Sequence, residues 1–197
     1  MVKPQKQRHN RLTGRRGQLG KLVVIGAQCK RSVTVSHYVA IGANLPGPDG
    51  ATPRQMCERA MNALANLPDL HIEVRSRWFS SAPIPAGPQP RYINGVVRLS
   101  GTTTPEALLI ALQHIEQQAG RVRSAPNAAR CLDLDIIDSA GLVRAAPDPI
   151  LPHPRAHQRA FVLLPLRDVA PTWIHPSLGL PIQTLIANLP AQDVRAE

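Results

Sequence analysis

Aromatic residues and cysteines are scarce in this sequence of 197 residues: Phe, Trp and Tyr together make up 3%, and there are three cysteines. Cys29, Cys57 and Cys131 are widely spaced and form no Cys-x-x-Cys pair. Their odd number and spacing argue against a disulfide framework or a zinc site and fit a reducing compartment. No apolar run reaches the roughly 20 residues of a membrane span, and residues 22–27 are too short for a secretory signal. We therefore expect a cytoplasmic protein without a membrane segment.

Acidic residues are absent from residues 1–35, which contain nine of the 23 Lys and Arg residues. The rest of the chain carries 14 basic and 13 acidic residues, so the net charge of +10 belongs to one end. We expect residues 1–35 to be a disordered basic extension, residues 36–190 to form one domain and residues 191–197 to be a tail. For the extension, a nucleic-acid or membrane-surface arm and a translated segment without function both stay open.

Apolar periodicity and turn residues divide the domain into six main elements. Strands are expected where apolar residues alternate, and helices where they recur three or four residues apart after a Thr-Pro pair. The predicted order is strand 37–41, helix 53–67, strand 72–78, strand 92–99, helix 105–120 and strand 130–136. This is the order of a ferredoxin-like βαββαβ split sheet with two helices over one face, an α/β (α+β) fold. A loop is expected at 80–91, and short C-terminal helices near 155–164 and 182–188.

Two aspartates, Asp133 and Asp135, lie in the last of these strands. Residues i and i+2 share a face of a strand, so both carboxylates point one way while Leu132, Leu134 and Ile136 point into the core. Neighbouring carboxylates repel each other, and a divalent cation removes that repulsion. Mg²⁺ typically binds one or two carboxylates together with substrate phosphates. A half-exposed strand with a solvated acidic face is the alternative.

Arginines precede and follow these aspartates: Arg121, Arg123 and Arg130 come just before them, and Arg155 and Arg159 come later. Guanidinium groups pair bidentately with phosphate, and several together can hold a polyphosphate. Their position at the end of a helix, where cations complement the helix dipole, would explain one of them without a ligand. Carboxylates for a metal ion close to arginines for phosphate indicate a phosphoryl-transfer site.

Tyr92 and Asn94 form a second pair on one face of a predicted strand. An aromatic ring for stacking, next to an amide that both donates and accepts, suits a flat heterocycle with mixed polar edges. Phe161 could supply a second ring surface. Taken alone, the pair is also compatible with an ordinary sheet surface, and Phe161 with the core.

Several of these residues occur in motifs that together resemble the 6-hydroxymethyl-7,8-dihydropterin pyrophosphokinases of folate biosynthesis. The resemblance covers about residues 37–190, and the Arg-x-Leu-Asp-Leu-Asp run is its most diagnostic part. The matching motifs, in chain order, are Gly42-Ala43-Asn44, Ser81-Ala82-Pro83, Tyr92-Ile93-Asn94, Glu116 with Gly120-Arg121-Val122-Arg123, Arg130 with Leu132-Asp133-Leu134-Asp135, and Pro152-His153-Pro154-Arg155 with Arg159-Ala160-Phe161.

The resemblance implies transfer of the β,γ-pyrophosphoryl group of ATP to the hydroxymethyl oxygen of the pterin, with release of AMP. It implies two Mg²⁺ ions on Asp133 and Asp135, and loops at 46–52, 80–91 and 123–130 that close over the site. The implied catalytic residues are Asp133, Asp135, Arg121, Arg123 and Arg130. The implied ATP-binding residues are Gln113, Glu116, Arg121, His153 and Arg159. The implied pterin-binding residues are Asn94, Tyr92, Phe161, Ser81, Ala82, Ile84, Gly42 and Asn44.

The sequence departs from this family pattern in two places. Ala43 replaces a serine that is usual there, and residues 124–129 lack the tryptophan that many members carry before the arginine. A catalytically degenerate relative that still binds pterin or nucleotide is therefore one alternative. An RNA-binding ferredoxin-like module is another, but it would have only Tyr92 for base stacking. We expect a monomer that uses small-molecule substrates and contacts nucleic acid, if at all, through its basic extension.

Overall fold

The computed structural model describes residues 33–121 and 129–197. The expected disorder of residues 1–32 concerns residues outside the described part, as do the predictions for Arg123 and most of the 123–130 loop. No helix within the described part is both long and apolar enough to cross a membrane.

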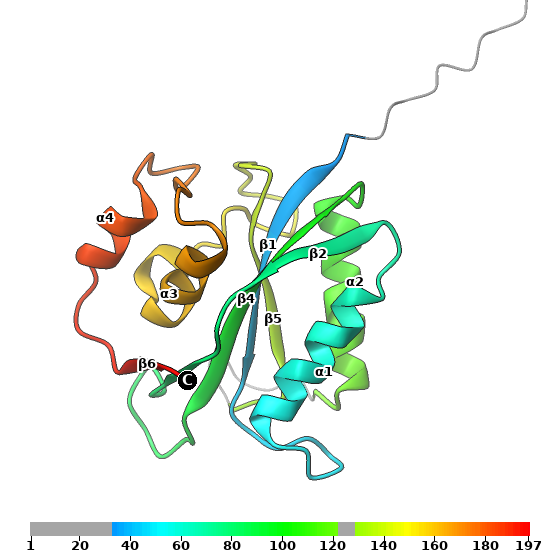
Figure 1. Cartoon of the computed structure of the whole chain (residues 1–197), viewed down its shortest axis with the longest axis vertical. Coiled ribbons are helices and arrows are strands. Elements are labelled where there is room, and N and C mark those ends of the chain that lie inside the picture. Colours follow the sequence, from blue (N-terminus) through cyan, green and yellow to red (C-terminus); the bar gives the residue numbers. More distant parts are fainter. Residues whose placement is uncertain (1–32, 122–128) are drawn as a thin grey trace, which may run out of the picture. The chain divides into compact units, whose positions relative to one another are not determined.

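An antiparallel sheet runs through the middle of the domain (Figure 1). Its strands follow the order β5-β1-β4-β3-β6, and β2 also pairs with β4. The strands are β1 (Val35–Ala43), β2 (Leu70–Arg75), β3 (Phe79–Ser81), β4 (Tyr92–Gly101), β5 (Asp133–Ser139) and β6 (Val194–Ala196). The predicted ferredoxin-like sheet is confirmed, with β1 and β4 as its long central strands.

Helices cover both faces of this sheet (Figure 1). On one face lie α1 (Pro53–Ala65) and α2 (Pro105–Gln118), which begin where Thr52 and Thr104 accept hydrogen bonds from the backbone of the first turn. On the other face lie α3 (Ala160–Val169) and α4 (Ile182–Ala187), preceded by a 3₁₀ turn at Ala156–Gln158. The sequence predicted two helices on one face and short C-terminal helices without a stated position. In the structure the C-terminal helices cover the second face of the sheet.

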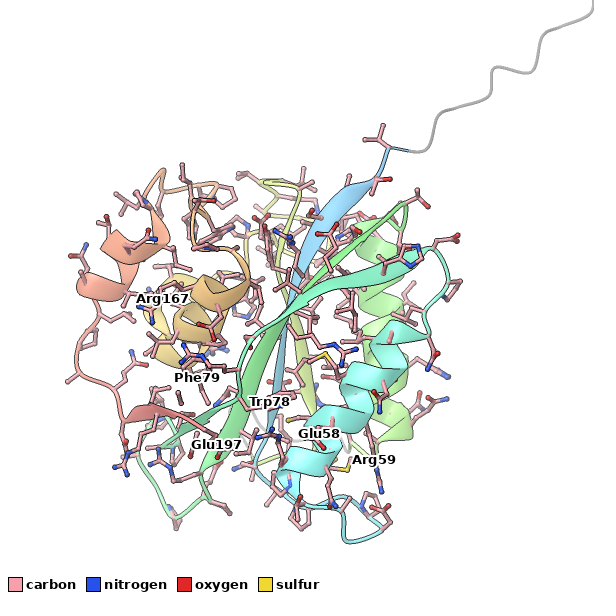
Figure 2. All side chains as sticks on the ribbon, viewed as in Figure 1. Glu58, Arg59, Trp78, Phe79, Arg167 and Glu197 are labelled. Carbon is pink, nitrogen blue, oxygen red and sulfur yellow. The ribbon has the colours of Figure 1, made fainter. Side chains whose placement is uncertain are left out.

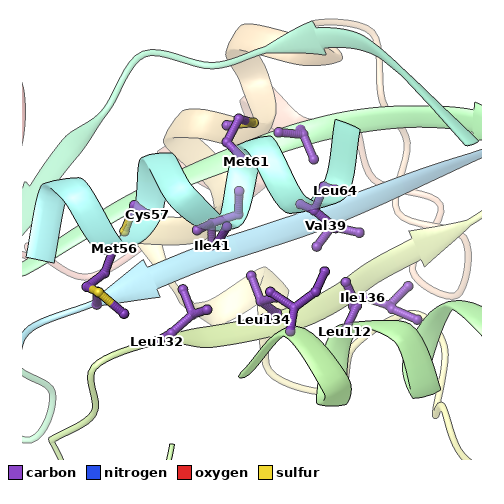
Figure 3. Packing of buried hydrophobic residues seen from close by; sticks show 14 of the residues in the cluster. Val39, Ile41, Met56, Cys57, Met61, Leu64, Leu112, Leu132, Leu134 and Ile136 are labelled. Atoms are coloured by element: carbon purple, nitrogen blue, oxygen red, sulfur yellow. The ribbon is translucent and has the colours of Figure 1, made fainter. Parts of the chain in front are cut away.

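A hydrophobic core lies between the sheet and helices α1 and α2 (Figure 3). Leu134 and Ile136 of β5, together with Leu132 just before it, face this core as the alternating pattern predicted, and β1 contributes Val39 and Ile41. Because alternate residues of a strand face opposite ways, Asp133 and Asp135 are turned to the other side of the sheet.

A second core lies between the sheet and helices α3 and α4. It contains Val96 of β4, whereas the next residue, Val97, belongs to the first core. Trp173 is buried in this second core, and its indole Nε1 donates to Asp138 Oδ2 at 2.8 Å. The other tryptophan, Trp78, packs at the border of the first core.

Two short strands were not predicted from the sequence. β3 falls at the start of the expected 80–91 loop, and β6 falls in the expected tail 191–197. They pair with each other, Ser81 opposite Val194, and β3 also pairs with β4. Three residues are too few to show an alternating pattern, so their strand character comes from long-range pairing.

Candidate active site

The site is built on a row of residues that crosses neighbouring strands. Asp133 of β5 lies opposite Gly42 of β1, Gly42 lies opposite Asn94 of β4, and Asn94 lies opposite Phe79 of β3. Directly opposite residues in a sheet are about 5 Å apart, so this register brings an acid and an amide close together with a glycine between them. A Cβ atom added at Gly42 would lie 3.6 Å from Asn94 Oδ1. The glycine therefore keeps the space between the two side chains open.

A small cavity of about 40 Å³ lies over this row. Phe161 and Val162, from the first turn of α3, form its other wall. The structure thus brings five of the predicted site residues to one cavity: Gly42, Asn94, Asp133, Asp135 and Phe161. They come from β1, β4, β5 and α3, so the site depends on the packing of α3 against the sheet.

Asp133 is held by two arginines. Its Oδ1 lies 2.9 Å from Arg121 Nη1 and 2.7 Å from Arg130 Nη1. All three side chains are half-buried, which strengthens their electrostatic interaction relative to a fully exposed pair. The two arginines predicted to bind phosphate therefore lie against one of the two predicted metal ligands.

Asp135 has a different environment. The imidazole of His153 faces it, with Nε2 3.8 Å from Asp135 Oδ2. Burial of the carboxylate and the nearby charge of Asp133 raise the pKa of Asp135. Burial likewise lowers the pKa of His153, whose Nδ1 accepts a hydrogen bond from the backbone N–H of Arg155. The carboxylate lacks a strong cationic partner among the described residues, so a cation would stabilise its charged form.

Arg159 lies next to this acid pair, at the start of α3. Its guanidinium group stacks on Phe161, 5.5 Å from the ring centroid. Burial, followed by the positive charge of Arg155, lowers the pKa of Arg159. Within the part of the chain that the structure describes, no carboxylate forms an ion pair with it. Two cations so close together favour a bound anion.

Glu116 of α2, predicted to bind ATP, takes part in the packing of the domain. It is buried and accepts a hydrogen bond from the backbone N–H of Leu134 at 2.7 Å. It also pairs with Arg121, which in turn reaches Asp133. Gln113, one turn earlier, is exposed at the surface. Glu116 thus holds α2 against β5 and orients Arg121, a role that depends on tertiary contacts and has no local sequence signal.

The buried Glu116 predicts a pH dependence of stability. Burial raises the pKa of Glu116 to about 7, and the Arg121 charge only partly opposes this. Between an unfolded pKa near 4.5 and about 7, the folded protein keeps a proton that the unfolded chain has lost, so stability falls as pH rises through that window. From the difference in pKa, we expect Glu116 to lower the free energy of unfolding by up to about 3 kcal/mol between pH 4.5 and pH 7.5.

Urea denaturation of wild type and Glu116→Gln at pH 5 and pH 8 would measure this effect. The neutral glutamine should remove that part of the pH dependence, whereas Glu58→Gln, at an exposed carboxylate of α1, should leave it unchanged. An equal pH dependence in wild type and Glu116→Gln would contradict the assignment.

Asn44 and Tyr92 do not line the cavity but fix the segments around it. Asn44 is buried; its Oδ1 accepts from the backbone N–H of Arg130 at 2.9 Å, and its Nδ2 donates to Gln89 Oε1 at 3.3 Å. The Tyr92 hydroxyl donates to the same Gln89 oxygen at 2.9 Å. Gln89 was not singled out from the sequence, because a glutamine in a proline-rich loop carries no local signal. These contacts tie the 80–91 loop to the strand ends.

The remaining predicted pterin residues lie at the end of β3 and at the start of the loop after it. Ser81 is buried, and its Oγ accepts a hydrogen bond from Asn94 Nδ2 at 3.0 Å. Ala82 comes directly after β3, and Ile84 is about half exposed. Ala43, where the family pattern has serine, is fully buried in the first core. A methyl group suits that apolar position.

A larger cavity, of about 350 Å³, lies on the opposite face of the sheet between α1 and α2. It is lined mainly by apolar side chains such as Met56, Ile115 and Leu132. Its charged residues, Asp49 and Arg59, already pair with each other at 2.6 Å. The chemistry-bearing side chains therefore gather at the smaller cavity.

Fold and site together define a class: a ferredoxin-like α/β domain with two carboxylates at one cavity and two arginines paired with one of them. A sequence model described as 7,8-dihydro-6-hydroxymethylpterin-pyrophosphokinase (HPPK) matches residues 38–171. The chain belongs to this HPPK family.

Named relatives agree with this assignment. A 2-amino-4-hydroxy-6-hydroxymethyldihydropteridine pyrophosphokinase of Pseudomonas aeruginosa is 38% identical over 157 residues, which cover 80% of this chain and 93% of that protein. A protein of the same name from Synechocystis is 39% identical over 130 residues, covering 66% of each chain. The folic acid synthesis protein fol1 of Pneumocystis carinii is 31% identical over 160 residues, and this chain spans only 20% of its length.

Solved structures share the fold. Wild-type Plasmodium falciparum HPPK-DHPS superposes with a TM-score of 0.60 at 12% identity, covering 80% of this chain and 45% of that one. A variant of that protein, solved with pterin and p-hydroxybenzoate, superposes with a TM-score of 0.60 at 11% identity, and the match covers 81% of this chain and 44% of that one. This chain thus spans less than half of those structures.

Proposed function

We propose that this chain transfers the pyrophosphoryl group of ATP to 6-hydroxymethyl-7,8-dihydropterin. In this reaction the hydroxymethyl oxygen attacks the β-phosphorus, the bond between the α–β bridging oxygen and the β-phosphorus breaks, and AMP leaves. The observation that carries the proposal is the meeting of Asp133, Asp135 and Asn94 at one cavity in a member of the HPPK family.

Asn94 is proposed to recognise the edge of the pterin. Its Nδ2 is engaged by Ser81, so its orientation is fixed, while its oxygen lies on the Gly42 side of the cavity. A fixed carbonyl oxygen can accept from ring or amino N–H groups of a pterin. Phe161 on the opposite wall offers a ring surface for stacking. The other pterin contacts, at Tyr92, Ala82 and Ile84, belong to the same proposal.

Arginines are proposed to hold the triphosphate. Arg121 and Arg130 currently neutralise Asp133, and Arg159 has no described ion-pair partner. Phosphate oxygens would compete with Asp133 for the first two guanidinium groups, because these groups bind phosphate bidentately. Competition would also free an oxygen of Asp133. His153, whose Nε2 faces Asp135, lies where it could donate to a phosphate oxygen.

The donor set at Asp133 and Asp135 fits Mg²⁺. Both carboxylates lie on one strand face and line one cavity, and substrate phosphates would complete an oxygen-only set. The described residues contain no group of three or more His, Cys, Asp or Glu side chains that could hold a metal alone. Two aspartates would therefore bind the cations only together with nucleotide. Held there, such ions would supply positive charge that neutralises the transferred group.

A cytoplasmic location and a monomeric state belong to the same proposal. Cys57 and Cys131 are buried free thiols rather than a disulfide, as suits a reducing compartment.

The direct test is AMP formation from ATP, Mg²⁺ and 6-hydroxymethyl-7,8-dihydropterin by the purified full chain. We expect AMP to form only when all three are present, and not with EDTA in excess of Mg²⁺. A known pyrophosphokinase in parallel validates the reagents. If that enzyme makes AMP and this chain does not, the proposal is wrong, and pterin binding without turnover would then indicate a catalytically degenerate member.

A further inference from the structure

The last residues of the chain contact two segments near the cavity: the start of α3, which lines it, and the loop after β3, which carries proposed pterin contacts. Gln192 and Asp193 are neighbours in sequence, but Gln192 contacts the start of α3 and Asp193 contacts the ends of the 82–91 loop. They lie beyond residues 38–171, the stretch matched to the family. The C-terminal segment is defined here as residues 191–197.

Asp193 holds both ends of the 82–91 loop. Its backbone carbonyl accepts from the N–H of Ala82 at 3.0 Å, where the loop begins. Its Oδ2 accepts from Arg91 Nη1 at 2.5 Å, where the loop ends. Arg91 also donates from Nε to Ser80 Oγ at 2.8 Å. A single residue thus closes the base of the loop, and Arg91 directly precedes Tyr92.

Strand β6 continues this contact along β3. It pairs residue by residue with β3, from Val194 opposite Ser81 to Ala196 opposite Phe79. Ser81 in turn accepts the hydrogen bond from Asn94. The last residue, Glu197, is anchored as well: its N–H donates to the carbonyl of Trp78 at 3.0 Å, and its carboxylate pairs with Arg54 at 3.0 Å. Figure 2 shows Trp78, Phe79 and Glu197 grouped at this end of the sheet.

Gln192 holds the second segment, the start of α3. Its Oε1 accepts from the backbone N–H of Ala160 at 2.9 Å, and its Nε2 donates to the carbonyl of Gln158 at 3.0 Å. These two backbone groups lie on either side of Arg159, and Ala160 directly precedes Phe161. The side chain also serves as the missing N-terminal cap of α3, since Arg159 makes no side-chain cap hydrogen bond.

We propose that Gln192 and Asp193 are positioning residues for two segments of the pterin site, the start of α3 and the 82–91 loop, and that the C-terminal segment sets the distance between them. The inference rests on the proposed function, because its kinetic consequences concern pterin and ATP. Asp193 acts on the 82–91 loop and hence on pterin alone. Gln192 acts on the backbone around Arg159 and Phe161 and hence on both substrates.

The contacts themselves favour a positioning role over a stabilising one. The Arg91 and Asp193 side chains are more than a third exposed, and exposed ion pairs contribute little to stability. Small displacements of groups that orient a substrate, in contrast, reduce turnover strongly. Loss of the pair should therefore change binding and rate more than it changes the melting temperature.

Steady-state kinetics of Asp193→Asn, Asp193→Glu and Gln192→Ala in the full chain would test this. We expect Asp193→Asn to raise KM for the pterin by about three- to tenfold, the range for one lost hydrogen bond, with KM for ATP unchanged. Asp193→Glu keeps a carboxylate and should restore most of the loss. Gln192→Ala should raise KM for both substrates. Glu73→Gln, which breaks a similarly exposed ion pair with Arg98, is the matched control and should change neither.

Amide hydrogen exchange gives a second readout that needs no turnover. Asp193→Asn should speed exchange in residues 82–91, and Gln192→Ala in residues 158–161. Unchanged exchange in both segments, or equal KM values in wild type and variants, would overturn the inference. Absence of AMP formation by wild type would instead refute the proposed function, and the exchange data would still decide the positioning role.

Discussion

Replacing Asp135 with alanine should lower the rate of AMP formation by about 10²–10³-fold, the cost typical of removing one group that stabilises a charged transition state. The side chain lines the proposed substrate cavity and has no strong cationic partner among the described residues. Its loss would remove half of the proposed Mg²⁺ donor set. The fold should survive, because burial and the charge of Asp133 already disfavour the charged carboxylate, as the raised pKa of Asp135 indicates. We expect the melting temperature to stay the same or to rise.

Asp138→Asn separates this effect from damage to β5. Asp138 lies on the same strand but is buried and accepts hydrogen bonds from Trp173 and Gly141. That variant should lose stability while its folded fraction stays active. AMP release and circular dichroism melting, measured on both proteins, give the comparison. Wild-type turnover by Asp135→Ala would remove the proposed metal role of this residue.

The second large effect is expected at Arg121. Arg121→Ala should lower kcat/KM for ATP by about 10²–10³-fold, because a guanidinium group that contacts transferring phosphates is worth at least that much in related chemistry. Arg121→Lys should recover only part of the loss, since an ammonium group cannot pair bidentately. Initial rates over a range of ATP concentrations would measure both variants.

Arg121 also pairs with Glu116, so a structural contribution has to be separated. Glu116→Gln removes the carboxylate that orients Arg121 while leaving the arginine in place. We expect a smaller loss of activity for it than for Arg121→Ala. Arg59→Ala, which breaks an exposed ion pair with Asp49, is the matched surface control. A kcat/KM for Arg121→Ala within threefold of the Arg59→Ala value would argue against a phosphate contact.

Local sequence patterns predicted most of the helices and strands of the fold. β1, α1, β4 and α2 lie where alternation or helical spacing placed them, because each is long enough for its buried face to set the pattern. The short strands β3 and β6 could not be found in this way, since the pairing of β3 with β6 joins residues more than 100 positions apart. The position of α3 over the second face likewise depends on which side of the sheet remains uncovered.

In the candidate site, too, the features set by local sequence were predictable and those set by tertiary contacts were not. The common direction of Asp133 and Asp135 follows from the two-residue period of a strand, and the cavity bears it out. The interaction of Arg121 with Glu116 and Asp133 joins a helix end to a strand, and the sequence gives no measure of that distance. Gln192 and Asp193 are polar residues near the end of the chain, and only their contacts distinguish them from a solvated terminus.

The two tryptophans of the chain are distributed one to each side of the sheet. Trp173 is buried and hydrogen-bonded, while Trp78 lies under the Arg54 guanidinium, 5.2 Å from its ring centroid. Each layer therefore carries its own intrinsic fluorophore. Trp78→Phe and Trp173→Phe would yield single-emitter proteins whose spectra report separately on the helical layers during unfolding, without any added dye.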